Sequence, residues 1–485
     1  MEQMNLGSAH SDEIMGIDLG TTNCAVSIYT ADTVPTLLPV GKGGKFTVPS
    51  CVKWERPEMD GCKPWTVGEE AYRERFMPDV VYSIKRMMGS GKKVRFTDRN
   101  NHDHYLELTP AEISSIILSH LKDRVAELYR PVKRCVITVP AYFDQRQIEN
   151  TIEAAKLAEL ECVQILKEPT SASYIYSLLG HAKNGSVLIY DLGGGTFDVT
   201  HMNFLRRDSI PKKLLTSLKR QYGIELENVQ GADLNEQYFC RILGTYGDVH
   251  LGGDDIDKEA AAQVIRRNNL QLNVNDKERL CLRCEECKKS GVYSTEFKLD
   301  DRTVTVTQDD VNKGVKYIFE KTLKIMGEID MDTVSTIVLV GGSTKSEYLR
   351  KLLSDKFPDK EISAVLDPDA TVALGAGSVA KAVANDDELL YSDVLPLPIG
   401  ILVDEKEVEV CIPRNTSMPY TVQREFYTLH DNQTQVTAHM YQGLSKKPKK
   451  CTYLGKLTLT DIPLAPAGEV KILVNFLLTR QGRQR

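Results

Sequence analysis

Two stretches of the sequence place an aspartate directly before a turn made of glycine and threonine. They are "GIDLGTTNCAV" at residues 16–26 and "IYDLGGGTFDV" at residues 189–199. Small residues in such a turn allow several backbone N–H groups and hydroxyls to converge on one anion, and phosphate is the natural guest. Asp18 and Asp191 would repel phosphate directly, so they fit best if a hydrated Mg²⁺ lies between carboxylate and phosphate. The pair of turns therefore predicts two hairpins that grip one polyphosphate.

A third glycine turn follows the apolar run in "TIVLVGGSTKSEYLRKLL". This run predicts a buried strand that ends at Gly341 and Gly342, with a helix opened by Ser343 or Thr344. A single such turn would be weak evidence for a phosphate site, because hairpins often contain Asp and Gly for conformational reasons alone. Other nucleotide motifs fail: "GSGKKV" has Lys93 where a P-loop needs Ser or Thr, and no GxGxxG follows a strand.

The elements that must position these turns alternate between strand and helix. Residues 14–29 and 186–202 read as hairpins, and residues 109–129 read as a helix with Thr109 as N-cap and Glu112 closing a capping box. A strand, a helix and a strand fill the region between residues 134 and 169. A duplicated hairpin in an α/β pattern predicts two related lobes that face each other.

From residue 396 the pattern changes to short alternating strands separated by turn residues, which predicts a β-sandwich. The join, "NDDELLYSDVLPLPIG", is acidic and then proline-rich, as expected for a linker that carries a small apolar plug, Leu389 and Leu390. The polar residues 206–236 are interpreted as an inserted surface segment, whose role the sequence leaves open.

Composition excludes some classes of protein. The formal net charge is −6 over 485 residues, which gives no electrostatic reason to expect nucleic acid or an anionic membrane as partner. No signal peptide or membrane-length apolar run is found, and eleven cysteines, an odd number, suit reduced thiols in a cytoplasmic protein. In "CLRCEEC", buried helical thiols are favoured over a metal site at Cys281, Cys284 and Cys287.

The sequence resembles the heat-shock protein 70 family of the DnaK type. The matching text, in the family's order, is "GIDLGTTN", "SIKRMMG", "VITVPAYF", "KEPTSASYIY", "YDLGGGTFDV", "HLGGDDID", "LVGGST" and "DPDATVALGA", followed by the sandwich text "IPRNTSMP", "HDNQTQVTAHMYQG" and "LGKLTLTDIP". The resemblance covers residues 14–478.

The resemblance implies an α/β two-lobed, actin-like (ribonuclease H-like) ATPase domain followed by a short, incomplete β-sandwich. The expected divisions are an N-terminal extension at 1–13, the nucleotide-binding domain at 14–384, a linker at 385–395, a peptide-binding sandwich at 396–480 and a polar tail at 481–485. Compared with the family pattern, the chain is expected to be C-terminally truncated and to lack the helical lid, which would leave an open sheet edge and fast peptide release.

The resemblance also implies roles for individual residues. The residues implied to act in ATP hydrolysis are Lys85, Glu168, Asp191, Thr196 and Asp18, with Asp18 and Asp191 holding Mg²⁺ through water. The residues implied to bind the nucleotide are Gly20, Thr21, Thr22, Gly193, Gly194, Gly195, Asp198, Gly253, Asp254, Glu285, Lys288, Gly341, Gly342, Ser343 and Asp369. Nucleotide state would be relayed by Pro140, Arg146, Leu389 and Leu390. Extended apolar peptides would contact Ile401, Val403, Phe426 and Val436.

Several alternatives stay open on the residues alone. Pro140 and Arg146 also fit a strand-ending proline and a solvated arginine, and the four peptide-contact residues also fit ordinary sandwich core. Lys345 stands where the family usually has an arginine that packs on adenine, so nucleotide affinity is expected to be lower.

The expected function is an ATP-dependent chaperone that acts in protein folding and the stress response. Its expected cofactors are ATP or ADP and Mg²⁺, with K⁺ as a further candidate ion. Its expected partners are unfolded polypeptides, a J-domain co-chaperone and a nucleotide exchange factor, with no nucleic acid and no membrane. The alternative is a nucleotide-dependent regulatory or co-chaperone-like protein without stable client binding. A sugar or metabolite kinase of the same fold is disfavoured, because the sandwich would then have no purpose.

Overall fold

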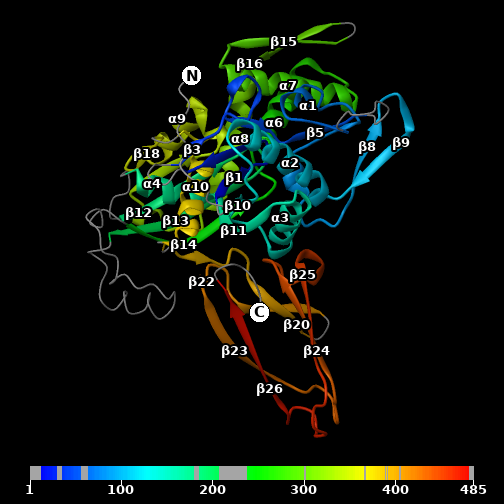
Figure 1. The fold of residues 1–485 in the computed structure, drawn as a ribbon, viewed down its shortest axis with the longest axis vertical. Helices are drawn as coiled ribbons and strands as arrows, with labels where there is room; N and C mark the ends of the chain where they lie inside the picture. The colour runs from blue at the N-terminus through cyan, green and yellow to red at the C-terminus, as the bar shows by residue number, and fades with distance from the viewer. Residues whose placement is uncertain are drawn as a thin grey trace.

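The computed structural model describes residues 13–29, 35–55, 64–179, 185–206, 238–299, 302–364, 367–387, 389, 391–403 and 406–479. A two-lobed α/β part is followed by a smaller all-β part that extends away from it (Figure 1). Of the predicted insertion at residues 206–236, the structure describes only residue 206. Leu390 also lies outside the described residues.

The sheet of the first lobe has the strand order β11-β10-β1-β2-β3, and β4 (Thr47–Pro49) also pairs with β2. The bounds of the five strands are Glu161–Lys167, Arg134–Val139, Ile14–Leu19, Asn23–Ile28 and Thr36–Leu37. The pairs β11–β10 and β10–β1 are parallel, whereas β1–β2 and β2–β3 are antiparallel. The apolar cluster under this sheet includes residues of α2 (Pro110–Leu128) and α3 (Gln145–Leu157).

The sheet of the second lobe repeats this topology in β18-β17-β12-β13-β14. The bounds are Glu361–Ser363, Thr336–Val340, Gly185–Leu192, Phe197–Arg206 and Tyr238–Asp248. Again two parallel pairs are followed by two antiparallel pairs, with β12–β13 in the place of β1–β2. The predicted duplication of a hairpin in two related lobes is confirmed.

Most predicted elements lie where the sequence placed them. Thr109 caps α2, with Glu112 completing the capping box. The predicted helix after Gly342 begins later than expected. Ser343 and Thr344 lie in a short 3₁₀ turn, because the Thr344 hydroxyl donates to the Gly341 carbonyl, and Ser346 is the N-cap of α9 (Glu347–Lys356).

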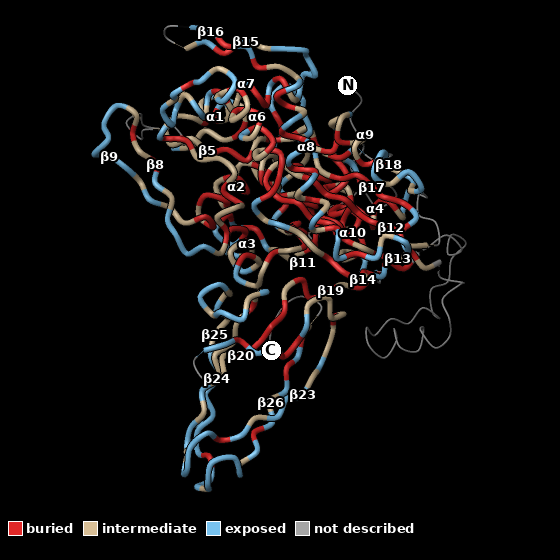
Figure 2. The backbone as a smooth tube through the Cα atoms, turned by 180° about the vertical axis from the view of Figure 1, so that it is seen from behind, coloured by how far each residue is buried: buried red, intermediate tan, exposed pale blue. Residues whose placement is uncertain are grey.

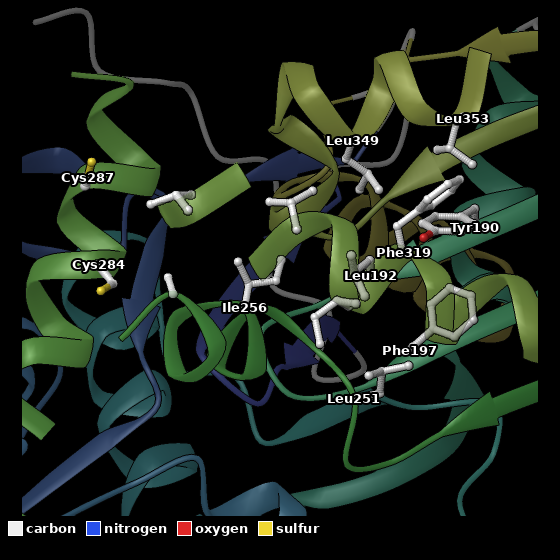
Figure 3. Packing of buried hydrophobic residues seen from close by; sticks show 14 of the residues in the cluster. Tyr190, Leu192, Phe197, Leu251, Ile256, Cys284, Cys287, Phe319, Leu349 and Leu353 are labelled. Carbon is white, nitrogen blue, oxygen red and sulfur yellow. The ribbon is translucent and has the colours of Figure 1, made fainter. Parts of the chain in front are cut away.

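The core of the second lobe lies under the sheet strands β12 and β13. Helices α6 (Gly253–Asn268), α7 (Val274–Ser290), α8 (Gln308–Met326) and α9 contribute buried residues to this core, and α7 packs on α6 and α8 (Figure 3). Tyr190 and Phe197 are fully buried with ring centroids 4.9 Å apart, and the Tyr190 hydroxyl donates to Thr322. Cys284 and Cys287 lie in this core on α7, as expected for helical thiols.

Helix α10 (Thr371–Ala384) joins the two lobes through close backbone contacts. A Cβ at Gly375 would lie 2.0 Å from the Ser171 carbonyl oxygen on α4 (Glu168–Leu178), and a Cβ at Gly16 on β1 would lie 2.2 Å from the Gly377 nitrogen. Glycine is therefore required at these positions for the helix to approach both elements.

The C-terminal part consists of two facing sheets, so the predicted β-sandwich is confirmed. One has the order β21-β20-β24-β25 and the other is the pair β23–β26. The bounds are Glu407–Ile412, Ile399–Val403, Val436–Gln442 and Thr452–Leu459 for the first, and Tyr420–Tyr427 and Lys471–Leu478 for the second. A short pair, β19 (Asp393–Val394) with β22 (Ser417–Met418), lies nearest the lobes. Figure 2 shows buried residues concentrated in the lobes and exposed residues along the far end of the sandwich.

Candidate functional site

The three glycine turns meet in one cleft of about 850 Å³ between the lobes. Predicted site residues that line it are Asp18, Gly20, Thr21, Thr22, Glu168, Asp191, Gly193, Gly194, Thr196, Gly253, Asp254, Glu285, Lys288, Gly341, Gly342, Ser343 and Asp369. Lys85, Gly195 and Asp198 lie directly behind this wall rather than on it, as their contacts with Glu168, Thr21 and Tyr142 show. The structure thus brings the predicted nucleotide residues together.

The two hairpin turns are packed against each other. A Cβ at Gly194 would lie 1.6 Å from Thr22 Oγ1, and a Cβ at Gly195 would lie 2.2 Å from Thr21 Cγ2. Thr22 Oγ1 is buried and has no hydrogen-bond partner among the residues that the structure describes. Because a buried hydroxyl without a partner is costly, its position in a glycine cradle fits an anionic ligand that accepts its hydrogen bond.

Four carboxylates gather behind these turns. Asp18 is the second-last residue of β1, where it accepts a hydrogen bond of 2.9 Å from Thr138 Oγ1, and Asp191 lies directly opposite Asp198 in the β12–β13 pair. Glu168 is the first residue of α4, and its Oε1 lies 2.6 Å from Lys85 Nζ in a buried ion pair.

Three carboxyl groups of this cluster have raised pKa values. Burial, and then the charge of Glu168, raise the pKa of Asp18 to about 7 and that of Asp198 to about 8. The same two causes raise the pKa of Asp191 well above its ordinary value. Lys85 lowers each of these pKa values, but the net shift of all three is upward. In the described part of the chain, no group of three His, Cys, Asp or Glu side chains could hold a metal ion by itself.

The opposite wall of the cleft is built from α6, α7 and the third turn. Lys288 Nζ donates to the Gly253 carbonyl at 2.9 Å and forms a 2.7 Å ion pair with Asp257. Ser343 Oγ donates to the carbonyl of Gly193 at 3.0 Å, which links the third turn to the second. Lys345 Nζ lies 2.6 Å from Asp369 Oδ2 at the rim of the cleft.

Glu285 is held by residues that the sequence analysis did not identify. Its carboxylate accepts a hydrogen bond of 2.6 Å from the Tyr72 hydroxyl and forms a buried ion pair with Arg75, whose guanidinium lies over the Tyr72 ring. Burial would raise the pKa of Glu285, but the charges of Arg75, Lys289 and Lys288 lower it to about 2. Tyr72 and Arg75 lie in a polar stretch without periodicity, so only their contacts in the fold reveal them.

A second set of contacts joins the lobes to the sandwich. Lys167 Nζ lies 2.8 Å from Asp393 Oδ1 and 2.6 Å from the Val394 carbonyl. Thr452 Oγ1 donates to Asp144 at 2.6 Å. The backbone N–H of Gln145 donates to Gln442 at 2.9 Å, and Arg414 forms an ion pair with Glu328. None of these contacts was predicted from the sequence.

The predicted relay residues lie near this junction. Pro140 is buried at the end of β10, Arg146 is exposed on α3 next to Gln145, and Leu389 packs against the core between the lobes. Ile401 is buried in the sandwich core, Val403 and Phe426 pack against that core, and Val436 is half-buried at the start of β24.

Comparison with known proteins assigns the chain to a family. The model of the family described as "Hsp70 protein" matches residues 14–207 and 234–483. The chain belongs to the Hsp70 family. The two-lobed part is thus an actin-like ATPase fold, followed by the β-sandwich. The residues between the two matched ranges lie inside the predicted insertion.

Similar Hsp70-family proteins share about a third of their residues with the chain. The chaperone protein DnaK of Metamycoplasma hominis is 32% identical over 497 residues, which cover 97% of this chain and 76% of that protein. A chaperone protein HscA homolog of Pseudomonas fluorescens is 32% identical over 501 residues, covering 96% and 74%. Membership of this family supports a chaperone function. Across the described ranges, the helices are too short or too polar to cross a bilayer.

Proposed function

We propose that this Hsp70-family protein is an ATPase that hydrolyses ATP in the cleft between its lobes and thereby regulates the binding of extended apolar polypeptides. The observation that carries the proposal is the meeting of the two hairpin turns, Thr21–Thr22 against Gly194–Gly195, directly above the carboxylate cluster. The proposed divisions are the ATPase domain at 14–384, the linker at 385–395 and the peptide-binding domain at 396–480.

The turns would bind the phosphates through backbone N–H groups and through the Thr22 hydroxyl, for which the described part of the chain offers no hydrogen-bond partner. Asp18 and Asp191 would hold Mg²⁺ through its water shell, with K⁺ a further candidate beside Asp198. Mg²⁺ supplies charge neutralisation on the phosphate oxygens when it is bound.

Lys85 and Glu168 are the residues best placed to act on the attacking water. The ion pair between them is buried, with Lys85 Nζ also hydrogen-bonded to the Leu19 carbonyl, so neither side chain can rotate freely. Glu168 lines the cleft and would orient the water, while Lys85 would fix the position of the Glu168 side chain and add positive charge near the γ-phosphate.

The nucleotide state would reach the sandwich through the end of β11. Lys167 contacts Asp393 and Val394 in β19, and the next residue, Glu168, lies in the cleft. A change in the position of Glu168 would therefore move the residue that holds the sandwich against the lobes. A J-domain co-chaperone and a nucleotide exchange factor are the proposed partners of this cycle.

A regulatory protein without stable client binding is the second candidate function. It is favoured by the burial of Ile401 in the sandwich core and by the packing of Val403 and Phe426 against that core. Binding of an extended leucine-rich peptide, measured by fluorescence anisotropy with and without ATP, separates the two functions.

The experiment that tests the proposal is single-turnover hydrolysis of ATP with Mg²⁺ by the wild-type chain, by Lys85→Ala and by the control Lys446→Ala. Lys446 is exposed on the sandwich. We expect turnover in the wild type and the control, and its loss in Lys85→Ala with ATP still bound. Stimulation by the peptide supports the coupled chaperone, and turnover without stimulation supports the regulatory protein. ATP binding without turnover in the wild type would refute the ATPase.

A further inference from the structure

Two cysteines lie side by side in the sheet of the first lobe. Cys135 is on β10 and Cys162 is on β11, and the two are direct partners across this parallel pair. Both side chains belong to the apolar cluster that includes residues of α2 and α3, so they point to the same face of the sheet. The ten described cysteines, including these two, are thiols and not disulfides in this structure.

The geometry of the pair suits a covalent bond. Neighbouring strands lie about 4.8 Å apart, which falls within the roughly 4.4–6.8 Å between Cα atoms that a disulfide requires. A bulge follows immediately: Cys135 pairs with Cys162, but Val136 pairs with Gln164, so Val163 has no opposite residue. A bulge at an edge strand permits the small adjustment that brings two sulfur atoms into bonding distance.

The two thiols differ in exposure. Cys135 is fully buried, whereas Cys162 is half-buried near the start of the edge strand β11. A hydrogen bond with the Cys162 thiol, together with burial, raises the pKa of Cys135 well above its ordinary value. Cys162 is therefore the thiol that a small oxidant reaches first, and Cys135 is the thiol placed to resolve the product.

We propose that Cys135 and Cys162 are a dithiol site that hydrogen peroxide oxidises to an intramolecular disulfide. The sulfur of Cys162 attacks one peroxide oxygen, the O–O bond breaks, and a sulfenic acid and one molecule of water form. The sulfur of Cys135 then attacks the sulfenic sulfur, the S–S bond forms, and hydroxide leaves and takes up the thiol proton as a second water. Two thiols are oxidised, and one molecule of hydrogen peroxide is reduced.

The disulfide would fasten the edge strand that leads to the junction with the sandwich. Among the described strands, β11 pairs only with β10, and it ends at Lys167, which contacts Asp393 and Val394. A covalent bond just before the bulge would fix the register of β11 at that point. The site does not depend on the proposed ATPase activity, because it rests only on the pairing of the two strands.

The test is treatment of the folded full-length chain with hydrogen peroxide, alkylation of the remaining thiols and non-reducing peptide mapping by mass spectrometry. We expect a linked pair of peptides that contain Cys135 and Cys162, lighter by two hydrogen atoms than the sum of the reduced peptides and separated by dithiothreitol. Cys162→Ser should abolish the linked pair and leave Cys135 open to alkylation after unfolding. Cys411→Ser, which removes a buried strand thiol of the sandwich, should leave it unchanged.

Three outcomes would overturn the proposal, and the wild-type chain alone shows each of them. The first is full alkylation of both cysteines after peroxide treatment. The second is conversion of Cys162 to sulfinic acid with no link to Cys135. The third is a link from either cysteine to a different cysteine, which would show that the strand pairing does not direct the reaction.

Discussion

Arg75 and Glu285 form a buried ion pair that joins the two lobes at the rim of the cleft. Arg75 follows α1 (Glu69–Arg73) in the first lobe, and Glu285 lies on α7 in the second. Both side chains are less than a tenth exposed, and Tyr72 contacts both of them. Glu285 and Tyr72 also line the cleft. Because Arg75 and Glu285 come from different lobes, their ion pair must break before the lobes can separate at this rim.

The first prediction concerns release of nucleotide. Arg75→Ala removes one partner of a buried ion pair and leaves Glu285 without its main counter-charge, which costs roughly 3–5 kcal/mol in comparable pairs. If the loss of the pair lowers the free-energy barrier to opening of the cleft by only about 1.4 kcal/mol, ADP release accelerates about tenfold. Stopped-flow displacement of a fluorescent ADP measures the rate. Arg95→Ala, at an exposed pair with Glu107, is the matched control and should release ADP at the wild-type rate.

The second prediction concerns stability in acid. Folding lowers the pKa of Glu285 from 4.5 to about 2, so its ionised form is favoured in the folded state. The ionised carboxylate therefore adds about 3 kcal/mol to the free energy of unfolding. This contribution is fully present above pH 4.5 and is lost as pH falls from 4.5 towards 2.

Urea unfolding of the wild type and of Glu285→Gln, at about pH 6 and about pH 3, isolates this contribution. The wild type should be more stable than the variant at the higher pH, and the difference should shrink at the lower pH. Glu425→Gln, at an exposed pair with Lys471, should show no such change. A difference between wild type and Glu285→Gln that does not depend on pH would contradict the assignment.

The third prediction concerns the contact between the two hairpin turns. Gly194→Ala places a methyl group 1.6 Å from Thr22 Oγ1 and 2.6 Å from its Cβ, so the turns must separate. At Gly193 the nearest atom would be 3.5 Å away, an ordinary contact. We expect Gly194→Ala to lower the melting temperature of the nucleotide-free protein and to weaken ATP binding at least tenfold. Gly193→Ala should retain the melting temperature, and equal losses in both variants would show that the turns do not touch.

The fourth prediction concerns the junction with the sandwich. Lys167→Gln leaves the carboxylate of Asp393 without its charged partner. We expect the free energy that holds the sandwich against the lobes to fall by about 2 kcal/mol, which corresponds to a roughly 30-fold smaller population of molecules with this junction formed. Hydrogen exchange at β19, followed by mass spectrometry, should become faster. Lys446→Gln, which changes an exposed lysine of the sandwich, should leave exchange at β19 as it is. Unchanged protection in Lys167→Gln would show that other contacts hold the junction.

The sequence predicted the elements whose signals are local. The two Asp-turn hairpins, the capping box of α2 and the alternating strands of the sandwich each depend on residues that are close in the chain. It failed at the start of α9, where Ser343 and Ser346 both suit an N-cap, and a hydrogen bond from Thr344 to Gly341 selects the later one.

The site was predictable where glycine and aspartate follow strands in a fixed order, and unpredictable where charges meet across the fold. Arg75 lies 210 positions before Glu285, and Lys167 lies 226 positions before Asp393. Such pairs have no periodicity and no local motif, so the sequence contains each residue but not its partner. The Cys135–Cys162 pair could not be predicted for the same reason, because the register of β10 and β11 determines which residues lie side by side.

The placement of Asp191 directly opposite Asp198 has a consequence for the lifetime of the protein. Like charges at opposing positions of two strands oppose folding, and both carboxylates are buried. Burial, and then the charge of Glu168, raise the pKa of Asp198 to about 8 and that of Asp191 well above its ordinary value, so both carboxyls bind a proton more readily in the ligand-free fold. Under the proposed function, a bound cation would displace these protons and would add to folding stability. Protein without bound ligand would then unfold more often than protein that carries it, and a protease that cleaves unfolded chains would remove the ligand-free fraction first.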